Sequence, residues 1–247
     1  MIRASPDKTQ ESGFPFDIFE RVPTDIAINL AAVRERIAKA AARAGRRPNE
    51  IKLVAVSKTH PAETLREAIA AGAAVLGENK VQEAESKIEE IGRSAAEWHL
   101  IGHLQSNKAR RAVQLFDVIQ SVDSLELAER LERICLEQRH DTLSVFVQID
   151  LAGEQTKSGV SEADLAQLVT FLKTCERLRF DGLMILPPFF DDAEETRPYF
   201  RRLRSIRDDI LPGGGLSMGM SHDFEVAIEE GATVVRVGTA VFGGREK

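Results

Sequence analysis

The sequence is poor in the residues that build disulfide scaffolds and metal sites. It has two cysteines in 247 residues, together with one tryptophan and one tyrosine. Cys135 and Cys175 lie far apart in helical patterns, so a disulfide framework is not expected, and a reducing compartment such as the cytoplasm is indicated. No Cys/His spacing is typical of a metal site.

The sequence also lacks long apolar runs and any excess of positive charge. No run approaches the roughly 20 apolar residues needed to cross a bilayer, and the first 21 residues carry charges and prolines instead of a secretory apolar core. Lys and Arg number 33 against 39 Asp and Glu, a net charge of −6. We therefore predict neither a nucleic acid nor a membrane as partner.

What the chain does contain is a repeated alternation of short apolar strands and helical patterns. Residues 51–56 form the first strand, whose composition predicts burial on both faces as in a parallel sheet, and Lys58 follows directly. Including this one, eight strands recur at intervals of about 25 residues. They are predicted at residues 51–58, 74–78, 98–102, 118–122, 143–151, 180–186, 216–219 and 233–238.

This alternation predicts an α/β fold, a single (β/α)₈ barrel. An open doubly wound sheet is the alternative, although no G-x-G-x-x-G turn follows the first strand. An extra helix from Thr24 or Asp25 to about Ala44 is predicted before the first strand, and Gly45 ends it. We assign residues 23–247 to the barrel domain and predict a flexible arm for residues 1–22.

A barrel collects the residues that follow its strands on one functional rim. These residues are Lys58, Asn79, His103, Ser121, Asp150, Pro187, Ser217 and Gly238. The loops after strands seven and eight, residues 217–221 and 238–240, offer small residues, hydroxyls and backbone N–H groups, which suit a phosphate. Ordinary turn chemistry is the alternative explanation for these residue types.

An amine on the first strand and a phosphate cradle on the last two suggest pyridoxal 5′-phosphate (PLP), whose aldehyde condenses with a lysine. Arg236 alternates with Val235 and Val237 in the last strand, so its side chain is predicted to enter the barrel. A buried guanidinium needs a partner. The pyridine nitrogen of PLP is one candidate, and an ion pair with Glu78 or Asp150 is the other.

Six motifs in the right order resemble the pyridoxal phosphate homeostasis protein family, and the match runs from about residue 24 to residue 244. They are Val-Ala-Val-Ser-Lys58-Thr, Gly-Glu-Asn79-Lys-Val-Gln-Glu, Trp-His99-Leu-Ile-Gly-His-Leu-Gln-Ser-Asn-Lys108, Gly182-Leu-Met, Leu-Ser217-Met-Gly-Met-Ser and Val-Arg236-Val-Gly-Thr-Ala-Val-Phe-Gly.

The resemblance implies the fold of the barrel domain of alanine racemase, without the second domain of that enzyme. It implies that Lys58 forms the Schiff base, that Arg236 faces the pyridine nitrogen and that Asn79 lies near the cofactor. It also implies phosphate contacts from Ser217, Gly238 and Thr239. The implied function is to hold PLP for vitamin B6 homeostasis, with PLP-dependent apoenzymes as partners and no strong catalytic turnover.

A racemase-like enzyme is the alternative, with an acid–base group among His99, His103 and His222. A two-base racemase needs a second proton carrier, and the single tyrosine, Tyr199, is expected to face outward on the helix after strand six. A barrel enzyme that acts on a sugar phosphate through Lys58 alone is a third class. A lone barrel is compatible with a monomer or a weak dimer.

Overall fold

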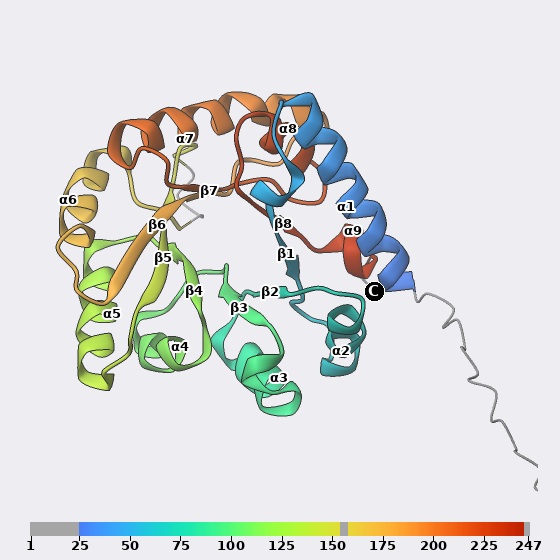
Figure 1. Ribbon diagram of the computed structural model, residues 1–247. Coiled ribbons are helices and arrows are strands. Elements are labelled where there is room, and N and C mark those ends of the chain that lie inside the picture. Colours follow the sequence, from blue (N-terminus) through green and yellow to red (C-terminus); the bar gives the residue numbers. More distant parts are fainter. Residues whose placement is uncertain (1–24, 154–157, 245–247) are drawn as a thin grey trace, which may run out of the picture.

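The computed structural model describes residues 25–153 and 158–244. Their strands form one closed parallel barrel in which each strand pairs with its neighbours in the chain and β1 pairs with β8 (Figure 1). The strands are β1 (Lys52–Val56), β2 (Val75–Glu78), β3 (Glu97–Leu100), β4 (Val118–Val122), β5 (Leu143–Ile149), β6 (Leu178–Ile185), β7 (Gly215–Ser217) and β8 (Val234–Val237). The predicted (β/α)₈ barrel is confirmed, and the open sheet is wrong.

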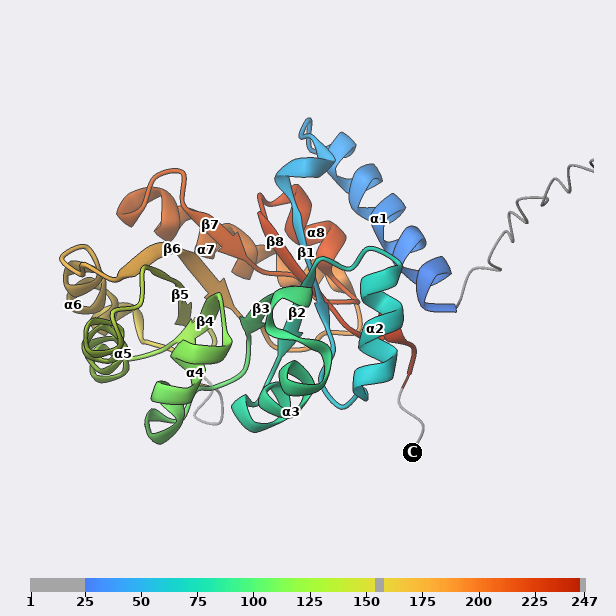
Figure 2. The ribbon, with the colours of Figure 1, turned by 60° about the horizontal axis from the view of Figure 1, so that its bottom comes forward.

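Helices follow the strands and form an outer ring around them in both views (Figure 1, Figure 2). They are α2 (Ala62–Ala70), α3 (Val81–Ile91), α4 (Ala109–Leu115), α5 (Leu125–Gln138), α6 (Glu162–Leu172), α7 (Arg197–Ile210), α8 (Phe224–Glu229) and α9 (Thr239–Phe242). Short 3₁₀ turns that the sequence did not predict precede α4 and α7, at Ser106–Lys108 and Ala193–Thr196.

The extra N-terminal helix is α1 (Asp25–Arg43). Its buried stripe, with Leu30 and Val33 at its centre, packs on α8, α9 and α2. The helix therefore covers the outside of the barrel on the side where β8 pairs with β1. Gly45 has φ +65° and supplies the left-handed residue that ends this helix. The arm predicted for residues 1–22 and the cap proposed at Thr24 lie outside the described residues.

The apolar core has two shells because side chains alternate between the two faces of a barrel strand. The larger shell lies between the strands and the helices. A smaller cluster joins residues from six strands, some of which are not neighbours, so it fills the barrel interior. It contains Val54, Val75, Val118, Phe146, Met184 and Val234.

The strands end where the chemistry was predicted to begin. β1 ends at Val56 and β8 at Val237, so Lys58 and Gly238 lie in the loops that leave the carboxyl ends of these two paired strands. The barrel therefore brings the first and last strands together although they are far apart in the sequence.

Candidate functional site at the carboxyl ends of the strands

A pocket of about 510 Å³ opens at the carboxyl ends of the strands. Five of the six predicted cofactor residues line it: Lys58, Asn79, Arg236, Gly238 and Thr239. Sequence reasoning did not assign its other lining residues to the cofactor. These are Val56, Ile101, Gly102, His103, Gln148, Ser158, Leu186, Phe189, Met220, Ser221 and His222.

The backbone on both sides of Lys58 is held by side chains from β2 and α3. The hydroxyl of Ser57 donates to Glu78 Oε1 at 2.6 Å, and Lys87 Nζ donates to the carbonyl of Ser57 at 2.8 Å. The N–H of Thr59 donates to a carboxylate oxygen of Glu83. These contacts fix the segment that carries the half-buried Lys58.

Thr59 adopts φ +69°, in the left-handed region. That conformation is unfavourable for a β-branched residue and is a genuine outlier next to a proposed functional lysine. The contacts around Lys58 hold Thr59 in this unfavourable conformation, and Lys87 links them. Lys87 Nζ donates to Glu78 Oε1 at 2.7 Å and to Glu83 Oε1 at 2.8 Å. Burial raises the pKa of Glu78, against the opposing effect of Lys87.

Arg236 is a buried cationic side chain in the pocket wall. It is 3% exposed, and its Nη1 and Nη2 donate to Ser217 Oγ at 2.6 Å and to the carbonyl of Ile185 at 2.8 Å. Both acceptors are neutral, and no carboxylate among the described residues forms a salt bridge with it. Burial lowers the pKa of Arg236 to about 10, although the charge of Asp223 opposes the shift.

The alternative partners of Arg236 are occupied elsewhere. Glu78 pairs with Lys87, and Asp150 Oδ1 accepts from the N–H groups of Ala152 and Gly153 at 3.0 Å each. The internal ion pair considered for Arg236 is therefore wrong. A buried guanidinium with neutral acceptors keeps its charge directed at the pocket.

The loops after β7 and β8 meet around Ser221. Its Oγ accepts from the N–H of Gly238 at 3.2 Å and from the N–H of Ala240 at 3.3 Å. Gly219 makes this approach possible: it has φ +92°, and a Cβ there would lie 2.6 Å from Ala227 Cβ. Both N–H groups thus have Ser221 Oγ as their acceptor, and an anion beside Thr239 would accept from the Ser221 hydroxyl or take its place as the acceptor of these N–H groups.

Ser217 is the one predicted cofactor residue that does not line the pocket. Its side chain is fully buried in β7, where it accepts from Arg236 and donates to Gln120 Oε1 at 2.5 Å. The resemblance assigned a phosphate contact to Ser217, the first serine of the motif Leu-Ser217-Met-Gly-Met-Ser, but the second serine, Ser221, is the one that lines the pocket. The turn at Gly219 gives that position to Ser221.

The three histidines considered as acid–base groups have different surroundings. His103 lines the pocket, and its Nδ1 lies 2.9 Å from Asp123 Oδ2. His222 lines the mouth, where its Nε2 lies 3.1 Å from the carbonyl of Asp191. His99 is buried inside the barrel and does not line this pocket.

Tyr199 lies on α7, packs partly buried against the outer core shell and is not among the residues that line the pocket. Among the described residues, no group of three or more His, Cys, Asp and Glu could hold a metal ion. In the same part of the chain, no helix is both long enough and apolar enough to span a membrane.

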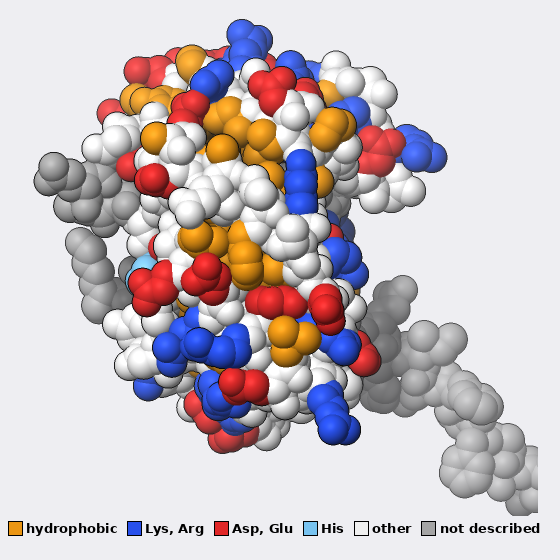
Figure 3. Space-filling model, turned by 90° about the vertical axis from the view of Figure 1, so that its left-hand side faces the viewer, with side chains coloured by type: hydrophobic (Ala, Val, Ile, Leu, Met, Phe, Trp, Pro, Cys, Tyr) orange, Lys and Arg blue, Asp and Glu red, His pale blue; other side chains and the backbone are white. Residues whose placement is uncertain are grey.

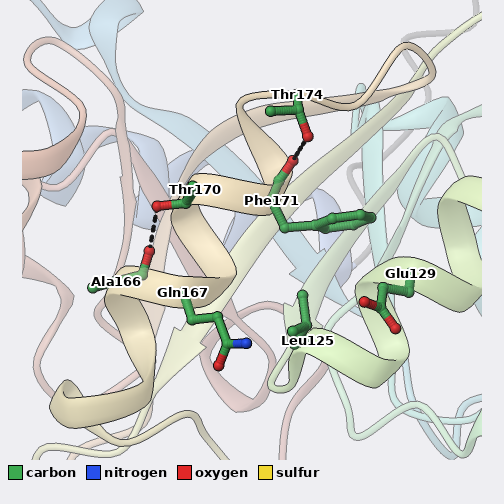
Figure 4. A pocket seen from close by; sticks show the side chains of 7 residues that line it. All are labelled: Leu125, Glu129, Ala166, Gln167, Thr170, Phe171 and Thr174. Atoms are coloured by element: carbon green, nitrogen blue, oxygen red, sulfur yellow. Dashed lines mark hydrogen bonds between the residues drawn. The ribbon is translucent and has the colours of Figure 1, made fainter.

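A second hollow lies on the outside of the barrel, between α5 and α6 (Figure 4). Its two threonines, Thr170 and Thr174, donate within their own helical segment, to the carbonyls of Ala166 and Phe171 at 2.8 and 2.7 Å. On this side of the molecule small hydrophobic patches alternate with charged side chains (Figure 3). No lysine or arginine of the described segments lines this groove, in contrast to the carboxyl-end pocket with Lys58 and Arg236.

Comparisons with known proteins agree with the barrel fold. Residues 28–246 match the family model "Alanine racemase, N-terminal domain". Alanine racemase from Corynebacterium glutamicum has the same fold, with a TM-score of 0.63 at 20% identity, over 88% of this chain and 61% of that one. The fold is thus that of the alanine racemase barrel domain.

Relatives of higher identity are more specific. The pyridoxal phosphate homeostasis protein of Aquifex aeolicus is 43% identical over 88% of this chain and 97% of its own length. That of Pseudomonas aeruginosa is 45% identical over 90% and 96%. A solved structure of PipY from Synechococcus elongatus with PLP bound is 41% identical, with a TM-score of 0.78, over 88% of this chain and 100% of that one. The chain belongs to the pyridoxal phosphate homeostasis protein family.

Proposed function

We propose that this protein binds PLP as a Schiff base on Lys58 and serves intracellular vitamin B6 homeostasis as a carrier. The observation that carries the proposal is the composition of one pocket wall: an amine at the end of β1, a buried guanidinium with neutral acceptors, and the N–H groups gathered around Ser221. The names of the relatives, and PLP in the PipY structure, support the same assignment.

Each part of the wall suits one part of the cofactor. When bound, PLP supplies an aldehyde that condenses with an amine. Lys58 provides that amine, Arg236 donates toward the pyridine nitrogen, and Asn79 lies alongside. Gly238 and Thr239 hold the phosphate, and we assign the serine of the phosphate site to Ser221, since Ser217 is engaged below the pocket by Arg236.

A carrier is favoured over an enzyme of high turnover because of the groups that face the pocket. The guanidinium of Arg236 offers only donors, so the pyridine nitrogen beside it stays unprotonated and the ring is a poor electron sink. Tyr199 does not line the pocket, so it offers no second base there. We extend the proposal to a cytoplasmic protein that is a monomer or a weak dimer and passes PLP to apoenzymes that depend on it.

One observation favours the alternative, a racemase-like enzyme. His103 lines the pocket and is paired with Asp123, which is the arrangement of an oriented acid–base group. Its side chain is 53% exposed, so it lies at the open mouth, where water competes for its proton.

The test is to add PLP to the apoprotein, reduce with borohydride, digest and locate the adduct by mass. We expect one adduct, on Lys58, and none in Lys58→Ala. Lys52→Ala is the matched control, since Lys52 belongs to the same strand but lies at its other end, where it pairs with Glu97. An unmodified Lys58 would refute the assignment. Interconversion of alanine isomers well above the Lys58→Ala background would instead favour the racemase.

A further inference from the structure

A line of buried polar side chains runs below Arg236 through the interior of the barrel. Arg236 Nη1 donates to Ser217 Oγ at 2.6 Å, and Ser217 Oγ donates to Gln120 Oε1 at 2.5 Å. Gln120 Nε2 lies 2.6 Å from His99 Nδ1, and His99 Nε2 lies 2.8 Å from Glu97 Oε1. The five residues come from β8, β7, β4 and β3. They connect the pocket to the amino end of the barrel.

The protons of this line have only one consistent arrangement when His99 is neutral. The carboxylate of Glu97 can only accept, so a neutral His99 carries its proton on Nε2 and donates it to Glu97. His99 Nδ1 then accepts from the NH₂ group of Gln120, which turns the amide oxygen toward Ser217. Ser217 accepts from Arg236 and donates its own proton to that oxygen.

The opposite arrangement requires a charged imidazole. If the Gln120 amide is reversed, its oxygen needs a proton on His99 Nδ1, and the carboxylate of Glu97 still needs one on Nε2. The charged groups around His99 are Glu97 on its own strand, Lys52 from β1 and Asp117 from the turn before β4. Burial lowers the pKa of His99, which favours the neutral ring and hence the first arrangement.

We propose that Ser217, Gln120 and His99 are positioning residues for Arg236. They form a hydrogen-bond relay with a fixed donor direction, anchored at Glu97, that holds the guanidinium at the wall of the cofactor pocket. The geometry supports it: the guanidinium has one hydroxyl and one backbone carbonyl as acceptors, and the orientation of that hydroxyl is set by the amide beyond it. That this positioning serves the hydrogen bond from Arg236 to the pyridine nitrogen of PLP rests on the function proposed above.

The first measurement is made on the apoprotein and needs no cofactor. Side-chain NMR reports the tautomer of His99 and the mobility of the Arg236 guanidinium. In the wild type we expect the Nε2–H tautomer and an immobile guanidinium. In Gln120→Leu and in Ser217→Ala we expect a mobile guanidinium, because each variant removes one link between Arg236 and His99. Ser144→Ala is the control: Ser144 is also a buried interior serine, but it bonds to Asp181, outside the relay.

The second measurement is the PLP dissociation constant, with the absorbance spectrum of bound PLP as the signature of the ring environment. We expect Gln120→Leu to weaken binding about tenfold and to shift the spectrum, because one buried hydrogen-bond partner is lost. Gln120→Glu should retain near-wild-type binding, since a carboxylate oxygen still accepts from Ser217. Its second oxygen requires a proton on His99 Nδ1, so the pKa of His99 should rise.

The outcomes separate the two proposals. If wild-type protein forms no Schiff base with PLP, the proposed function fails, while the NMR readouts still decide the relay. If His99 carries its proton on Nδ1 in the wild type, or the guanidinium stays immobile in Gln120→Leu, the relay is refuted. If the guanidinium becomes mobile in Gln120→Leu but the PLP affinity and spectrum of that variant match the wild type, the relay does not position Arg236 for the cofactor, and the inference is overturned.

Discussion

Both ends of the barrel carry a polar hollow, but the cationic side chains in the two hollows have different hydrogen-bond acceptors. At the amino end a hollow of about 470 Å³ contains Lys52 and Arg179, and each forms two contacts with a carboxylate. Lys52 lies 2.8 and 3.0 Å from the oxygens of Glu97, and Arg179 lies 2.7 and 2.9 Å from those of Asp181. At the carboxyl end Arg236 is held by a hydroxyl and a carbonyl.

The difference shows that cations at the amino end of the barrel form ion pairs within the protein, whereas Arg236 at the carboxyl end is available to a ligand. A carboxylate partner compensates the charge of a cation, so little electrostatic attraction remains for a ligand. The charge of Arg236 is not compensated by its two hydrogen-bond acceptors, because both are neutral. Chemistry in barrels of this type occurs at the carboxyl ends of the strands. The pairing state of the cations therefore identifies the binding end independently of the lysine.

The largest effect that would sharpen this comparison is expected at Lys87, the buried cation under the Lys58 loop. Lys87→Met leaves the fully buried Glu78 without its cation and should destabilise the protein by about 3–5 kcal/mol in urea unfolding. The matched change at the other end is Lys52→Met. Lys52 is 44% exposed, and its loss should cost about 0–1 kcal/mol.

The Lys87 effect should also depend on pH. The pKa of Glu78 is already raised by burial, and removal of Lys87 raises it further. A raised carboxyl pKa contributes stability at low pH that is lost as the pH rises through the folded-state value. The deficit of Lys87→Met should thus be smaller at acid pH than at neutral pH, and equal deficits at both would argue against a buried charge.

An intermediate effect is expected at Gly219, which shapes the loop that carries Ser221. Gly219→Ala places a Cβ 2.6 Å from Ala227 Cβ and 2.8 Å from Phe224 Cα at φ +92°. We expect a loss of about 2–3 kcal/mol of stability together with weaker PLP binding. Gly213→Ala, at φ +81° with no atom within 4 Å of the new Cβ, should cost about 1 kcal/mol and leave PLP affinity unchanged.

The smallest effect is expected at Glu97, which anchors the amino end. The hydrogen bond from His99, aided by Lys52 against the opposing effect of burial, lowers the pKa of Glu97 from 4.5 to about 2. A lowered carboxyl pKa contributes stability above the unfolded value that disappears as the pH falls from 4.5 toward 2. Because the side chain is 35% exposed, we expect a contribution of about 1 kcal/mol.

The measurement for Glu97 is the free energy of unfolding against pH in the wild type and in Glu97→Gln. The amide cannot ionise, so the variant's curve should be flatter between pH 4.5 and 2. Parallel curves would show that the lowered pKa does not stabilise the fold.

The sequence by itself determined the barrel, the place of Lys58 and the interior direction of Arg236. Strands that are buried on both faces consist of consecutive apolar residues in the sequence, and side chains along such a strand alternate between the barrel interior and the helices. The residue after each run then lies on the rim. These are local properties, so residues 51–58 and 233–238 could be interpreted without their partners.

Only the tertiary structure decided which groups satisfy the buried polar atoms. Ser217 and Gln120 are 97 residues apart in the chain and 2.5 Å apart in the barrel, so no local pattern relates them. The same holds for Arg236, whose acceptors come from β7 and the end of β6, and for Ser221, which the turn at Gly219 brings to Gly238. Hydrogen-bond partners depend on distances between strands, and the closure of the barrel sets those distances.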